Sequence, residues 1–174
     1  MEKAQVQAKP AVLGKEAIRA IIQFAALVGI ATLAPMIGNQ FITGPIVNAV
    51  LFIATAILGV RWGIMVGLIP SVIALSVGLL PAPLAPMIPF IMISNAIMVV
   101  IFGYLRERNF WLGMISASAV KFLFLFLTSS VVTGLLLKSE LAPTVAQILS
   151  WPQLATALGG GILAWAFLKA IKRI

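Results

Sequence analysis

Apolar segments of membrane-spanning length recur along this 174-residue chain. A run of about 18 or more apolar residues can cross a hydrocarbon core of about 30 Å as an α-helix. Because that core offers no water to backbone N–H and C=O groups, a chain that crosses it must form helices or a closed barrel. The apolar runs are continuous and show no alternation with polar residues, which favours helices. The sequence, 62% hydrophobic and 9% charged, therefore predicts an all-α integral membrane protein.

Six transmembrane helices can be assigned from these runs. They cover residues 17–36, 45–59, 63–80, 87–105, 109–137 and 153–170. Residues 1–16 are polar and are expected to form a cytoplasmic tail. Residues 17–174 are then a single six-helix transmembrane domain, with no soluble domain attached.

The cations of the chain are distributed unevenly about these spans. One side holds the two ends and the joins after the second and fourth spans, with Lys3, Lys9, Lys15, Arg19, Arg61, Arg106, Arg108, Lys169, Lys172 and Arg173. The other side has only Lys138, in a set of loops at 38–44, 81–86 and 138–152. The positive-inside rule places both termini in the cytoplasm. Anionic lipid headgroups account for the net charge of +8, so no nucleic-acid partner is expected.

Lys121 is the exception, because it lies near the middle of the fifth span. The acids Glu2, Glu16, Glu107 and Glu140 all lie in terminal or connecting segments, and the chain has no Asp. A lysine at that depth costs several kcal/mol unless it is paired or hydrated. One interpretation is that an anionic ligand supplies the missing charge. The other is structural: the ammonium reaches the interface, or carbonyl groups and water in the bundle satisfy it.

Several chemistries are excluded by what the chain lacks. Without Cys, His or Asp it cannot build a thiolate or imidazole metal site, or a Ser-His-Asp constellation. It has no phosphate-binding loop with Gly-Lys-Ser or Gly-Lys-Thr, and no acid within the spans to relay protons. We therefore expect neither an enzyme nor a self-powered pump, and no cofactor or metal.

The few polar residues inside the spans are the remaining candidates for a site. Helical periodicity places Ser118, Lys121 and Thr128 on one face of the fifth helix, where they would either line a cavity or serve packing. Asn95 in the fourth span needs a partner on another helix or in a ligand. For Asn48 in the second span, a tie between helices is the favoured reading. Residues 159–161, three glycines, indicate either a close approach of two backbones or a flexible point.

The run of residues 41–105 resembles a substrate-binding S component of an energy-coupling factor (ECF) transporter. The likeness is carried by the polar first loop IGNQFITGP, the join GVRWG, the proline-rich loop LPAPLAPMIP and the six-helix layout. It implies a binding subunit in the plasma membrane of a prokaryote, with high affinity for a vitamin or related micronutrient. It also implies docking onto a transmembrane T component that carries two cytoplasmic ATPases.

The resemblance also implies positions for two sites. Small residues on the first helix would contact the T component, and the nearest here are Ala25, Gly29 and Ala34. The ligand site would be built from the first loop and the fourth, fifth and sixth helices, with Asn39, Gln40, Asn95, Lys121 and Gln153.

Lys121 favours a small anionic substrate. Among the family's substrates, the carboxylates biotin, pantothenate, nicotinate, lipoate and folate come before the cationic thiamine. Two other functions stay open: a structural membrane subunit that anchors a larger complex, and a small facilitator that works as a homo-oligomer.

Overall fold

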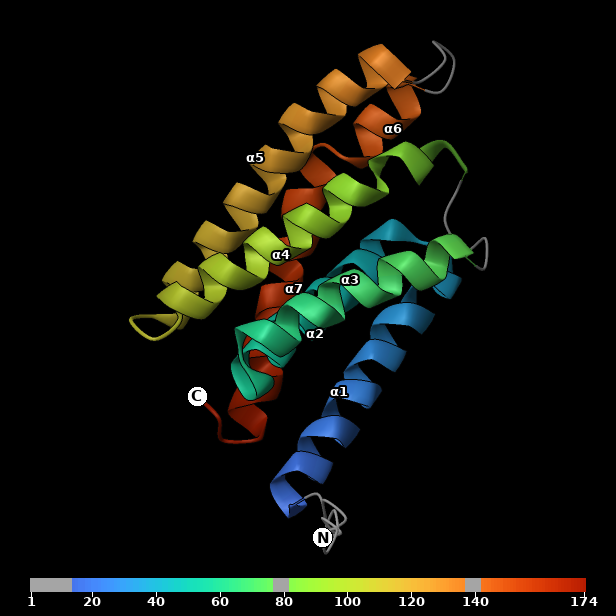
Figure 1. Ribbon diagram of the computed structural model, residues 1–174. Helices are drawn as coiled ribbons and strands as arrows, with labels where there is room; N and C mark the ends of the chain where they lie inside the picture. The colour runs from blue at the N-terminus through green and yellow to red at the C-terminus, as the bar shows by residue number, and fades with distance from the viewer. Residues whose placement is uncertain (1–13, 77–81, 137–141) are drawn as a thin grey trace, which may run out of the picture.

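The computed structural model describes residues 14–76, 82–136 and 142–174. Within these ranges every regular element is helical, which confirms the expected all-α class (Figure 1). In chain order the elements are α1 Lys15–Leu33, the 3₁₀ helix η1 Ala34–Ile37, α2 Gln40–Leu58, α3 Val60–Ser76, the 3₁₀ helix η2 Ala82–Met87, α4 Ile88–Leu105, α5 Phe110–Leu136, α6 Ala142–Ile148 and α7 Trp151–Ala170.

Helix α2 is the centre of the bundle. Its residues 48–55 are all buried, so this stretch has protein on every side. The neighbours α1, α3, α4 and α7 all pack against it. In the core, the rings of Phe52 on α2 and Phe102 on α4 meet edge to face with centroids 4.7 Å apart, a favoured aromatic geometry.

Small residues bring α7 into direct backbone contact with α2. A Cβ at Gly160 would lie 2.7 Å from the carbonyl oxygen of Pro45 and 2.8 Å from the amide nitrogen of Ala49. On the other side of the contact, a Cβ at Gly44 would lie 2.7 Å from the Cβ of Thr156. The close approach predicted from the three glycines is therefore confirmed at Gly160.

The turn between α2 and α3 is tighter than expected. Gly59 adopts a φ of +91°, which L side chains rarely reach, so that α2 ends at Leu58 and α3 begins at Val60. The predicted start of the third span at residue 63 was therefore too late. Arg61, assigned to a loop, lies in the first turn of α3.

The start of α2 is also earlier than predicted. Asn39 caps the helix, because its side-chain oxygen accepts a hydrogen bond from the amide of Phe41 at 2.9 Å. The helix then continues through Pro45. The first loop, expected at 38–44, is therefore reduced to Gly38 and Asn39, and Gln40 belongs to the first turn of α2.

Within the described residues, four stretches are long and apolar enough to span a membrane: Lys15–Ile37, Gln40–Leu58, Ala85–Leu105 and Phe110–Val132. A shorter apolar helix covers Val60–Ile73. Helix α7 has 20 residues but is not among these stretches. The count of six spans and the side on which the termini lie thus stay predictions. In Figure 1 the start of α1 and the end of α7 point to the same end of the bundle.

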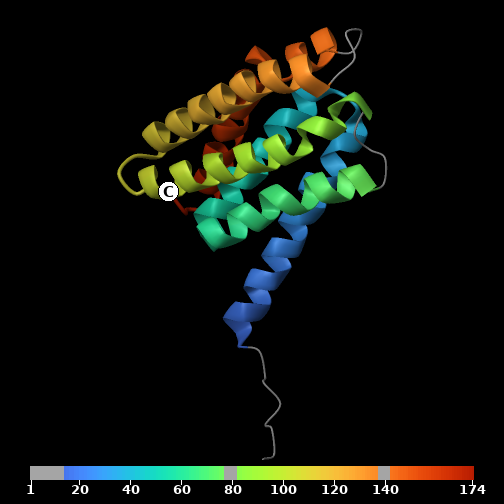
Figure 2. The same cartoon turned by 45° about the horizontal axis from the view of Figure 1, so that its top comes forward.

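Helix α1 is the most open of these elements. Figure 2 shows its N-terminal half extending beyond the other helices, and Ile18, Ile22 and Leu33 on it are exposed. Lys15 and Glu16, assigned to the tail, form its first turn. Three parts of the prediction lie outside the described residues: the tail to residue 13, the end of the third span and first loop residue at 77–81, and the stretch 137–141 that contains Lys138.

Candidate functional site

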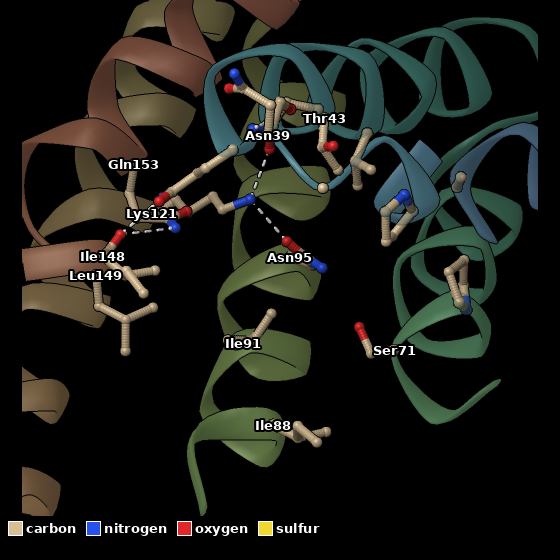
Figure 3. A pocket seen from close by; sticks show the side chains of 18 residues that line it. Asn39, Thr43, Ser71, Ile88, Ile91, Asn95, Lys121, Ile148, Leu149 and Gln153 are labelled. Atoms are coloured by element: carbon tan, nitrogen blue, oxygen red, sulfur yellow. Dashed lines mark hydrogen bonds between the residues drawn. The ribbon is translucent and has the colours of Figure 1, made fainter. Parts of the chain in front are cut away.

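The ammonium group of Lys121 joins three helices. Its Nζ donates to Oδ1 of Asn48 on α2 at 2.6 Å and to Oδ1 of Asn95 on α4 at 2.7 Å (Figure 3). The lysine itself comes from α5 and is only 4% exposed. The contacts are short, as expected for hydrogen bonds from a charged donor. The amide groups of two helices thus hold a buried cation from a third.

Both amides are oriented by backbone carbonyls. The Nδ2 of Asn48 donates to the carbonyl of Gly44 at 2.9 Å, one turn earlier on α2. The Nδ2 of Asn95 donates to the carbonyl of Gly67 on α3 at 3.2 Å. Because the amide nitrogens are held in this way, the oxygens face Lys121. An ammonium has three N–H groups, and the two asparagines take two of them.

A cavity of about 400 Å³ opens beside this cluster. That size lies at the lower end of the range for small-molecule sites, roughly 300–1,000 Å³. Five helices and the junction between α6 and α7 contribute to its wall. Among the lining residues, all within the described part of the chain, Lys121 alone is charged. The wall is otherwise apolar, as at Ile88, Ile91 and Leu149, or carries neutral amides and hydroxyls.

Contacts of α2 with the end of α6 and the start of α7 lie beside the cavity. The carbonyl of Ile148 accepts hydrogen bonds from Nε2 of Gln40 at 2.8 Å and from Nε2 of Gln153 at 3.2 Å. Nearby, the rings of Phe41 and Trp151 lie with centroids 5.8 Å apart. The two glutamines thus share one carbonyl, and both line the cavity.

The structure brings together most of the residues that were predicted as ligand contacts. Asn39, Gln40, Asn95, Lys121 and Gln153 all line the cavity. Ser118 and Thr128 are not among the lining residues. The hydroxyl of Thr128 bonds back to the carbonyl of Phe124 at 2.7 Å, and that of Ser118 is buried without a hydrogen-bond partner among the described residues.

Asn48 is the main residue that sequence reasoning left out of the ligand site. It was read as a tie between helices, and its contact with Lys121 is such a tie, but the same residue also lines the cavity. Ser71 was also left out and lines the cavity, as does Thr43 of the polar first loop IGNQFITGP, which was expected to contribute ligand contacts. The buried position of Asn48 in an apolar span was the available signal. Asn48 and Lys121 are 73 residues apart in the sequence, so their contact depends on how the helices pack.

The small residues predicted to contact the T component, two on α1 and one on η1, have different environments. Ala25 is exposed, and a Cβ added at Gly29 would meet no atom within 4 Å. Ala34 instead is 6% exposed and lies in η1, where its carbonyl accepts a hydrogen bond from the hydroxyl of Thr43 at 3.1 Å. Ala25 and Gly29 thus lie in open space, whereas Ala34 lies inside the bundle.

The family model for the substrate-specific component of ECF transporters matches residues 19–172. The chain belongs to this family. It is a membrane-embedded substrate-binding subunit of an ECF transporter, in the plasma membrane of a prokaryote. Family members are binding subunits of transporters and not enzymes, and membership implies a T component and ATPases as partners. No curated protein and no solved structure matches the chain at a significant level.

Proposed function

We propose that this S component captures a small organic anion at the outer face of the membrane, in the cavity beside Lys121. A T component with two ATPases then energises its uptake. The observation that carries the proposal is the single charged group in the cavity wall. The neutral neighbours of Lys121 supply no counter-charge to its ammonium group, so an anion gains a charge-assisted contact when it enters.

The contacts of Lys121 with Asn48 and Asn95 do not replace a ligand anion. An amide oxygen satisfies an N–H group but contributes no net charge. A purely structural tie between α2, α4 and α5 would also need no cavity beside it, and the wall of this one includes all three residues. The structural role and the ligand role are therefore compatible in the same side chain.

The distribution of cations supports entry from the outside. Asn39, Gln40 and Gln153 line the cavity, and all three lie near loops that the positive-inside rule assigns to the outer face. The opposite end of the bundle includes Arg106, whose Nη1 donates to the carbonyl of Ala56 at the end of α2 at 2.9 Å. In this orientation the substrate enters from outside, and the cation-rich end faces the ATPases.

The open face of α1 is the proposed contact with the T component. Ala25 and Gly29 are small, one helical turn apart and uncovered, and small residues at this spacing let two membrane helices approach closely. Ala34 is buried, so its part in docking would be indirect, by fixing η1 against α2.

The test of this function uses the chain with and without its partners. Mass spectrometry of the detergent-purified chain should find one small anionic compound that is enriched over a mock purification. Proteoliposomes that contain the chain, the T component and the ATPases should accumulate that compound only with ATP. Accumulation by the chain alone would instead support a facilitator, and a stable partner without ATPases, with no co-purified compound, would support a structural subunit.

A further inference from the structure

The residues that line the cavity follow one face of each of two helices. On α2 they are Gln40, Thr43, Gly44, Val47 and Asn48, and on α4 they are Ile88, Ile91 and Asn95. This spacing of three and four residues is that of a single helical face. At a rise of about 1.5 Å per residue, each face extends roughly 10–12 Å from the start of its helix to the amide that holds Lys121.

From this arrangement we propose that the substrate is a monocarboxylate of about 10–12 Å, with an apolar middle and a neutral hydrogen-bonding group at its far end. The inference rests on the proposed function and narrows its substrate class. The carboxylate, the apolar middle and the neutral far end of the substrate are each inferred from a different region of the cavity wall.

The carboxylate follows from the third N–H group of Lys121. Asn48 and Asn95 accept from two of the three N–H groups, so one remains for a ligand oxygen. Because no second cation lines the cavity in the described residues, a second negative charge would be desolvated without a partner. Dicarboxylates and phosphate esters are therefore disfavoured.

The apolar middle follows from the wall next to the ammonium. Figure 3 shows Ile88, Ile91 and Asn95 along the same side of α4, with Lys121 at the Asn95 end. Leu149 lies across the cavity, near the junction of α6 and α7. These side chains offer no hydrogen bonds, so a polar group at this level would lose its water without compensation.

The neutral far end follows from the glutamines. Gln40 and Gln153 each donate one N–H to the carbonyl of Ile148, and each amide also has a second N–H and an acceptor oxygen. A ureido, amide or hydroxyl group on the substrate suits these neutral groups, whereas a charged group would find no counter-charge there.

The first test compares acids with neutral molecules of the same shape. The full chain in lipid nanodiscs is titrated with biotin and biotinamide, and with lipoate and lipoamide. At least one acid should bind about 30-fold or more tightly than its amide, the lower end expected for a buried charge-assisted contact. In Lys121→Met the preference should vanish. Lys169→Met, which removes the same charge at the exposed end of α7, should keep it.

A second variant tests the charge without removing the lysine. Asn48→Asp places a carboxylate where the amide oxygen now lies 2.6 Å from Nζ. The cavity then has no net charge, so the acid should lose its advantage and the amide should bind at least as well as the acid. Retention of the preference for the acid in Asn48→Asp would contradict the proposal.

The outcomes separate this inference from the proposed function. Equal binding of acid and amide by the native chain, or no binding of either acid at millimolar concentration, would overturn the substrate class. If the purified chain still carries an enriched compound, and that compound is accumulated with ATP, the proposed function stands. Methyl esterification of that compound gives an independent count of its carboxyl groups, and any number other than one would also overturn the class.

Discussion

Gly160 on α7 lies directly against Asn48 on α2: a Cβ added at Gly160 would be 2.6 Å from the Cβ of Asn48. The same asparagine accepts a hydrogen bond from Lys121. A close contact of α7 with α2 is thus located at the residue that positions the charge of the cavity. Asn48 therefore takes part both in the packing of α7 against α2 and in the candidate ligand site.

Gly160→Ala is expected to destabilise the bundle by about 1–3 kcal/mol, the usual range for overpacking. Two of the atoms that the new methyl group would meet belong to the backbone of α2, so the helices must move apart. The measurement is the thermal unfolding midpoint in detergent. Gly134→Ala on α5 is the matched control, because its Cβ would meet nothing within 4 Å and alanine favours the helix. Equal midpoints for the two variants would contradict the packing argument.

Lys121→Met should leave the chain folded but weaken binding of the co-purified anion by about 2–5 kcal/mol. The variant loses two hydrogen bonds from a charged donor, each worth about 1.5–3 kcal/mol, and also removes a desolvated cation. Because these changes oppose each other, the elution profile and unfolding midpoint should stay near those of the native chain. Lys121→Arg should restore binding only in part, since a planar guanidinium does not replace a compact ammonium. An aggregated Lys121→Met protein would instead indicate a structural tie.

The helical class and most helix positions followed from the sequence because apolar length is a local property. The start of helix α5 at Phe110 was placed to within one residue. The starts of α2 and α3 were missed because Asn39 and Gly59 let helices begin next to one another, and polar or glycine-rich residues were read as loop. The contact of Asn48 with Lys121 could not be predicted, because it depends on which helices pack together and no local sequence pattern shows that. Ser118 and Thr128 shared a face with Lys121, but hydroxyls can also bond within their own helix.

The predicted topology can be checked with single cysteines, because the native chain has none. Asn39, just before α2, and Arg108, between α4 and α5, are both exposed. The start of α2 and the turn from α4 to α5 lie at opposite ends of the bundle (Figure 1). In intact cells a membrane-impermeant thiol reagent should label Asn39→Cys, and should label Arg108→Cys only after the membrane is opened. The reverse pattern would place the cation-rich end outside and refute the positive-inside assignment.

Docking through α1 predicts that Ala25→Leu lowers the amount of T component recovered with the chain. The larger side chain fills the space over Gly29 that a partner helix would need. Ala119→Leu is the control, because Ala119 is equally exposed but lies on α5. The yield of the co-purified compound should be the same in both variants. Equal recovery of the T component would place the contact on another helix.

The two asparagines also bear on how fast and how tightly such a subunit can capture a scarce nutrient. A free lysine side chain loses up to about 2 kcal/mol of rotamer entropy when it is immobilised. Here Asn48 and Asn95 fix the ammonium before any substrate arrives. The side-chain entropy of Lys121 is therefore lost when the protein folds and not when the substrate binds. The cavity is thereby preorganised for its ligand, and affinity can be high without a large rearrangement of the side chain that recognises it.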